Sequence, residues 1–177
     1  EIRALVGEEG VLPPVESWQP ERSGEIDIRI DSNGVWFYQG DEMQRQSVVR
    51  LLSRILRKDD DAYYLVTPAE KMKISVDDVP FLVGMMDVEG EGEAQKIHFS
   101  TQTGDYFTLS QVHPLRFVYN ERNEPTPYVL VRHEMLAKLS RPVYYQLVDH
   151  IGAKDTDAES EEGQELGVWS DGEFFSI

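Results

Sequence analysis

Basic side chains are scarce in this sequence, and they are the residues that could bind an anion. The chain has 17 lysines and arginines against 33 aspartates and glutamates, a net charge of −16 at pH 7. Because the many carboxylates repel a phosphate, scarce cations should mark any anion site. Arg45 is the first candidate, since it precedes a predicted helix on the side of its apolar residues and should be partly buried. A buried guanidinium needs an anionic ligand or a carboxylate, and Asp27 is the structural alternative.

Three further cations and one tyrosine complete the predicted ligand-binding residues. Arg29 and Lys71 lie on polar faces of predicted strands in the first half of the chain, and Arg132 lies on a predicted strand in the second half. If these faces converge, they suit a phosphate or carboxylate; otherwise each cation protects its strand from edge pairing. Tyr128 could stack on a ligand ring, with packing inside the protein as the alternative.

Motifs for the common catalytic chemistries are missing from the sequence. The chain has no cysteine, which excludes thiolate nucleophiles and thiolate metal sites. Its four histidines show no metal-ligand spacing. It has neither a glycine-rich phosphate loop nor the Gly-x-Ser-x-Gly elbow of serine hydrolases. We therefore predict no catalytic residue, no metal site and no cofactor.

Composition and charge indicate the setting in which the protein works. The absence of cysteine is typical of a reducing compartment, and no apolar run approaches the roughly 18 residues that cross a bilayer. We therefore expect a cytoplasmic protein without membrane contact. The net charge of −16 predicts repulsion from extended nucleic acid.

Hydrophobic periodicity predicts a first domain over residues 21–77. Residues 26–30 alternate as a strand, and turn signals at Asn33-Gly34 and Gly40-Asp41 predict further strands at 35–39 and 42–45. Residues 47–57 form the clearest predicted helix, with Arg50, Arg54, Arg57 and Lys58 on its polar face. Two more strands are predicted at 63–66 and 72–76. Before this domain, residues 1–20 read as the end of a helix and a proline-rich linker.

The second predicted domain covers residues 78–177. Strands are predicted at 81–88, 96–101, 106–110, 115–119 and 128–132, followed by short helices near 134–139 and 142–151. An acidic loop and a final hairpin, 166–170 with 173–177, complete it. Gly34-Val35-Trp36 and Gly167-Val168-Trp169 both lead into hairpins, which indicates either coincidence or duplication of one α+β unit. We expect both tryptophans to be mostly buried.

Three segments resemble an uncharacterised bacterial family, domain of unknown function 1285. They are residues 24–30 (GEIDIRI), 65–71 (LVTPAEK) and 167–170 (GVWS), and the resemblance spans nearly the whole chain. It implies an α+β fold of two small domains, each an antiparallel sheet plus helix, with a duplicated core and a second domain similar to pleckstrin-homology-like folds. It also implies a ligand site between the domains and a signalling role. The family offers no catalytic residue that could be carried over.

These observations favour a ligand-binding module over an enzyme. The expected partner is a small anionic, nucleotide-like molecule bound between the two domains by Arg29, Arg45, Lys71, Tyr128 and Arg132. Two alternatives stay open. A hydrolase or nuclease could gather acidic residues around magnesium, and an interaction scaffold could bind a protein partner through an exposed sheet edge.

Overall fold

The computed structural model describes residues 11–155 and 164–177. The helix end expected over 1–7 and most of the acidic loop lie outside the described residues. The chain divides into two compact units: unit 1 runs to Pro80 and takes in His133–Met135, and unit 2 comprises Phe81–Arg132 and Leu136–Ile177. Each unit is described by itself.

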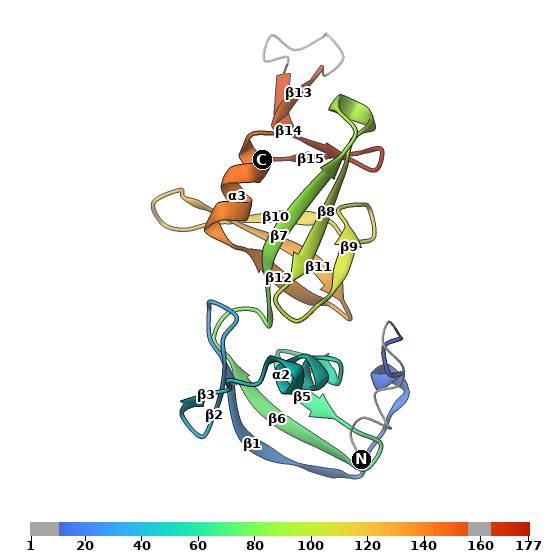
Figure 1. Ribbon diagram of the computed structural model, residues 1–177, viewed down its shortest axis with the longest axis vertical. Helices are drawn as coiled ribbons and strands as arrows, with labels where there is room; N and C mark the ends of the chain where they lie inside the picture. Colours follow the sequence, from blue (N-terminus) through green and yellow to red (C-terminus); the bar gives the residue numbers. More distant parts are fainter. Residues whose placement is uncertain (1–10, 156–163) are drawn as a thin grey trace. The chain divides into compact units, whose positions relative to one another are not determined.

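Unit 1 is a six-stranded sheet with one short helix, α2 (Gln46–Ser53), against one of its faces (Figure 1). A 3₁₀ turn, η1 (Val15–Ser17), precedes the sheet. The sheet order is β3-β2-β1-β6-β5-β4. The strands are β1 (Arg22–Ile30), β2 (Trp36–Tyr38), β3 (Asp41–Glu42), β4 (Leu56–Asp59), β5 (Ala62–Val66) and β6 (Glu70–Val76).

Unit 2 contains a second six-stranded sheet, in the order β10-β11-β12-β7-β8-β9, and helix α3 (Arg141–Val148), which packs against β7. Its strands are β7 (Phe81–Glu89), β8 (Lys96–Thr101), β9 (Tyr106–Thr108), β10 (Leu115–Tyr119), β11 (Pro125–Arg132) and β12 (Met135–Leu139). A 3₁₀ turn, η2 (Gly92–Ala94), separates β7 from β8. A small third sheet comprises β13 (Gly152–Asp155), β14 (Gln164–Ser170) and β15 (Glu173–Ser176).

Both six-stranded sheets have the same topology, which confirms the predicted α+β fold with its duplicated appearance. In each, two three-stranded antiparallel meanders are joined where the first strand of one lies parallel to the last strand of the other: β1 with β6, and β7 with β12. The sheets are therefore not wholly antiparallel. The helix occupies different places, between the meanders in unit 1 and after them in unit 2.

The predicted helix over 47–57 is too long. The amides of Arg54 and Ile55 bond to carbonyls three residues back, which tightens the last turn, and β4 then pairs with β5. Leu56 pairs with Leu65 of β5 and is completely buried. Arg57 and Lys58 are therefore strand residues rather than part of a solvated helix face.

The predicted helix near 134–139 is wrong, because this segment is strand β12. Met135, Ala137 and Leu139 are buried, whereas Leu136 and Lys138 between them are only half-buried. That is the period of two of a strand, and β12 pairs in parallel with β7 from Ala137 to Leu139. Five residues are too few to separate the two periodicities by sequence alone.

The repeated Gly-Val-Trp motif does not mark equivalent positions in the two units. Trp36 lies on β2, whose topological counterpart in unit 2 is β8, but Trp169 lies on β14 of the third sheet. Trp36 is 2% exposed, as expected. Trp169 is only half-buried, and its ring contacts Phe174, its cross-strand partner on β15 of the same sheet.

Truncating the two tryptophans should therefore have unequal effects. Trp36→Ala empties a fully enclosed site and should lower the free energy of unfolding by about 3–5 kcal/mol. Trp169→Ala should cost roughly half as much, because less apolar area is lost. Urea denaturation followed by circular dichroism measures both. Equal losses would show that the third sheet encloses Trp169 as fully as unit 1 encloses Trp36.

Candidate functional site

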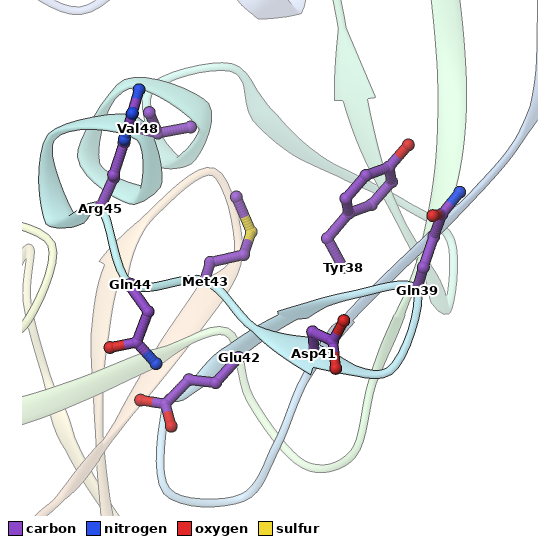
Figure 2. Close-up of a pocket in the computed structure, with 8 residues that line it drawn as sticks. All are labelled: Tyr38, Gln39, Asp41, Glu42, Met43, Gln44, Arg45 and Val48. Atoms are coloured by element: carbon purple, nitrogen blue, oxygen red, sulfur yellow. The ribbon is translucent and has the colours of Figure 1, made fainter.

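Unit 1 has a pocket of about 300 Å³ between the β2–β3 hairpin and the start of α2 (Figure 2). We call it the hairpin pocket. Its lining comes from one continuous stretch of chain: Tyr38, Gln39, Asp41, Glu42, Met43, Gln44, Arg45 and Val48. Its size is at the lower end of the range for small-molecule sites.

Strand register decides which of these side chains face α2. Tyr38 pairs with Asp41, and the amide of Met43 donates to the carbonyl of Trp36. Directly paired residues share a face, so Tyr38, Asp41 and Met43 lie on the side of buried Trp36. Figure 2 shows Tyr38 and Met43 on the helix side of the hairpin, with Glu42 directed away from it.

The turn between the two strands fixes this pairing. Gln39 and Gly40 both have positive φ, 50° and 85°, as the two central residues of a type I′ hairpin turn require. This left-handed conformation is unfavourable for glutamine. The amide of Gln39 donates to the carbonyl of Asp27, which anchors the turn to β1. Tyr38 and Asp41 are thus held opposite each other on β2 and on the edge strand β3.

The expected partial burial of Arg45 is wrong, because Arg45 is exposed. It is the N-cap of α2, with φ −83° and ψ 97°, so it lies before the helical stripe that packs on the sheet. Asp27 is not its partner, since Ile28 and Ile30 face the core and Asp27 therefore points to the opposite face. Within the part of the chain that the structure describes, the Arg45 guanidinium makes no ion pair or hydrogen bond.

Two of the predicted binding residues in unit 1 have carboxylate partners. Arg29 donates to Asp77 at 2.5–3.1 Å, and its hydrogen bonds lower the pKa of that carboxyl. Lys71 lies 2.5 Å from Asp59 and 4.0 Å from the centre of the Tyr64 ring. Neither residue lines the hairpin pocket.

Arg57 and Asp59 form the most enclosed ion pair of unit 1. Arg57 is 5% exposed, donates to both Asp59 oxygens at 2.9 Å, and also donates to the carbonyls of Val15 and Trp18 at 2.8 Å. It therefore ties η1 to the sheet. Partial burial raises the pKa of Asp59, but the hydrogen bonds from Arg57 and Lys71 outweigh it and hold that pKa below its ordinary value.

The other two predicted residues lie in unit 2. Arg132 donates to Asp105 at 3.0 Å and stacks on Phe81, 4.9 Å from the ring centre. Thr101 and Thr103 donate to the same carboxylate, so this cluster braces the turn before β9. Tyr128 is half-buried on β11, opposite Arg116. The hairpin pocket therefore contains Arg45 alone of the five predicted residues.

Tyr38, Asp41 and Met43 are pocket residues that the sequence analysis does not single out as ligand-binding. The Gly40-Asp41 turn was recognised, but it was placed one residue late. With Gln39 and Gly40 as the two turn residues, Tyr38 and Asp41 become the closing pair of the hairpin. Placing the turn at Gln39-Gly40 instead of Gly40-Asp41 would have identified Asp41 as a strand residue opposite Tyr38.

Unit 2 has a second pocket, of about 310 Å³, beside Trp169. Gly90, Gly92 and Gly152 form part of its wall, and its charged residues are Glu91 and Asp149. Carboxylates without a lysine or arginine among them would repel an anion. This pocket is therefore a poorer anion site than the hairpin pocket.

Within residues 11–155 and 164–177, no three histidine, aspartate or glutamate side chains gather closely enough to hold a metal ion. Over the same residues, no helix is long and apolar enough to cross a membrane.

The ion pair at Asp59 predicts an acid-sensitive unit 1. Because its pKa is lower in the folded than in the unfolded state, Asp59 contributes stability that is complete above about pH 5 and lost as pH falls through the folded pKa. Asp59→Asn should destabilise unit 1 at pH 7 by about 3 kcal/mol, since it leaves buried Arg57 without its charge partner. It should also flatten the fall in melting temperature between pH 5 and pH 3.

Thermal melts of wild type and Asp59→Asn across that pH range test this linkage. Asp61→Asn is the matched control, because Asp61 is exposed in the same turn and forms no ion pair within the described part of the chain. An acid dependence that Asp59→Asn leaves unchanged, or that Asp61→Asn removes equally, would assign it to other carboxylates.

Comparison with known proteins identifies relatives over the whole described chain. The N-terminal domain of DUF1285, a domain of unknown function, matches residues 13–79, and the C-terminal domain of the same family matches residues 80–177. No protein with a curated description matches.

Two solved structures are similar to this chain. A DUF1285 family protein from Silicibacter pomeroyi DSS-3 is 38% identical with a TM-score of 0.85, over 98% of this chain and 91% of that one. A DUF1285 family protein from Shewanella baltica OS155 is 26% identical with a TM-score of 0.53, over 69% of this chain and 90% of that one. The chain therefore belongs to the DUF1285 family.

Proposed function

We propose that this protein is a ligand-binding module with a regulatory role, and that its hairpin pocket binds a small anionic, nucleotide-like molecule. The observation that carries the proposal is the placement of Arg45. Its guanidinium has no carboxylate partner among the described residues, and Arg45 lines the same pocket as Tyr38, a residue that is 45% exposed. A cation and an aromatic face together are what a phosphate and a base need.

The cations of unit 1 differ in their partners. Arg29, Arg57 and Lys71 each pair with a carboxylate, whereas Arg45 is the lysine or arginine that lines the hairpin pocket. Because the Arg45 guanidinium makes no ion pair within the described residues, no intramolecular pair has to be broken before it binds a ligand. It is available to form two parallel hydrogen bonds with one phosphate group.

Pocket size and charge restrict the ligand further. About 300 Å³ suits one base and one sugar phosphate rather than a larger molecule. Arg45 supplies a single positive charge, and the net charge of −16 opposes a polyphosphate. Met43 and Val48, both half-buried, supply apolar contacts beside the Tyr38 ring. We therefore propose a mononucleotide as the best match.

Nucleotide binding and its loss on substitution test this function. Isothermal titration calorimetry with nucleoside monophosphates should detect binding to wild type. Arg45→Ala should weaken it by about tenfold or more, because a charged hydrogen-bond pair contributes about 1.5–3 kcal/mol. Tyr38→Ala should weaken it comparably through lost stacking, worth about 1–3 kcal/mol per base.

Arg50→Ala is the matched control, since Arg50 is exposed on the same helix and does not line the pocket. Lys71→Ala should lower stability without changing nucleotide affinity. Absence of binding by every monophosphate, or affinities that survive both Arg45→Ala and Tyr38→Ala, would contradict the proposed site.

A further inference from the structure

The carboxylate of Asp41 lies across the hairpin from the Tyr38 ring. The two residues are direct partners in the β2–β3 register, so their side chains share the face toward α2. Both line the hairpin pocket and both are exposed. Over the described ranges, the Asp41 side chain makes no hydrogen bond or ion pair. The pocket thus presents an uncommitted acceptor beside its aromatic face.

Register makes Asp41 the carboxylate that a stacked base would meet. Cross-strand partners have Cβ atoms about 4.5–5.5 Å apart, so a base lying on the Tyr38 ring would bring one edge to the Asp41 oxygens. Glu42 pairs with Phe37 and therefore faces the other side of the sheet, which it shares with Arg29. The edge of the base next to Asp41 must consequently suit a carboxylate.

An ionised carboxylate only accepts hydrogen bonds, so it selects a base edge that carries adjacent donors. Guanine presents its N1–H and its 2-amino group side by side, and both can donate to the two oxygens at once. Adenine places the N1 lone pair next to its 6-amino donor, and cytosine likewise places N3 next to its 4-amino group. In both cases one carboxylate oxygen would face a lone pair.

We infer that the hairpin pocket prefers guanine nucleotides, with Asp41 as the residue that determines base specificity. The inference rests on the proposed function and deepens it. Arg45 would bind the phosphate, Tyr38 would stack on the ring, and Asp41 would accept from N1–H and the 2-amino group. The lining has one arginine against Asp41 and Glu42 and therefore no excess of positive charge, so the ligand is selected by the position of its groups rather than by total charge.

Calorimetric titration with GMP, IMP, AMP and XMP tests base selection. Wild type should bind GMP about tenfold more tightly than AMP, in the range of one bidentate base contact. IMP should fall between them, because it keeps N1–H and lacks the 2-amino group. XMP carries a carbonyl in place of that amino group and should bind weakly to wild type.

Asp41→Asn should reverse this order. The asparagine amide offers one acceptor and one donor, which match N1–H and the 2-carbonyl of xanthine. The variant should lose about tenfold in GMP affinity and gain in XMP affinity. Asp27→Asn is the matched control, because it removes the same charge from an exposed residue on the opposite face of the sheet and should keep the wild-type order.

The outcomes separate this inference from the binding function itself. GMP and AMP affinities that are equal in wild type, and that both fall in Arg45→Ala, would overturn the guanine preference and leave the binding function standing. A guanine preference unchanged by Asp41→Asn would overturn the role of Asp41. Absence of binding by these four nucleotides and by the pyrimidine monophosphates would overturn both proposals together.

Discussion

One parallel strand pair holds each six-stranded sheet together. In unit 1, the two meanders meet only where β1 lies beside β6, and β7 with β12 does the same in unit 2. Each antiparallel meander could form from local turns, but the parallel pair requires the first and last strands of the sheet to meet. The register of β1 fixes which of its side chains are buried, and through β2 it fixes the face of the hairpin pocket.

Arg57 holds η1 to the sheet of unit 1 and forms an ion pair with Asp59, whereas Arg45 lines the hairpin pocket without such a partner among the described residues. Arg57 donates from the sheet to the carbonyls of Val15, the first residue of η1, and of Trp18, which follows η1. Asp59 forms ion pairs with both Arg57 and Lys71. Removing a partner from such an enclosed group is costly, so these cations are fixed in place. Arg45 lies at the exposed start of α2, and its side chain forms no ion pair or hydrogen bond with the described residues. Arg57 is therefore a structural cation, and Arg45, which lines the hairpin pocket, is the candidate for ligand binding.

Much of the fold follows from the sequence because strand alternation and turn residues are local signals. Strands β1, β2, β5 and β6 and the Asn33-Gly34 turn were predicted near their observed places, and so was helix α3. Strand β4 was taken for helix because the apolar spacing of Ile55 and Leu56 fits both periods, and only pairing with β5 decides between them. Parallel pairing between distant strands has no local signature, so the sheet order could not be predicted.

The candidate site was less predictable than the fold. Arg45 is exposed rather than buried, and the pocket that it lines depends on strand pairing that has no local signal in the sequence. Asp41 was hidden by a one-residue error in the turn, because such a shift exchanges the faces of every following side chain. Arg29 and Lys71 are isolated cations in the sequence, but in the fold they lie beside Asp77 and Asp59.

The most direct test of this account is a titration of GMP into ¹⁵N-labelled protein, followed by NMR chemical-shift changes of the backbone amides. We predict that the largest saturable shifts fall on the amides of the hairpin pocket, from Tyr38 to Val48. Shifts centred on Gly90–Gly92 and Trp169, or no saturable shift at all, would contradict it.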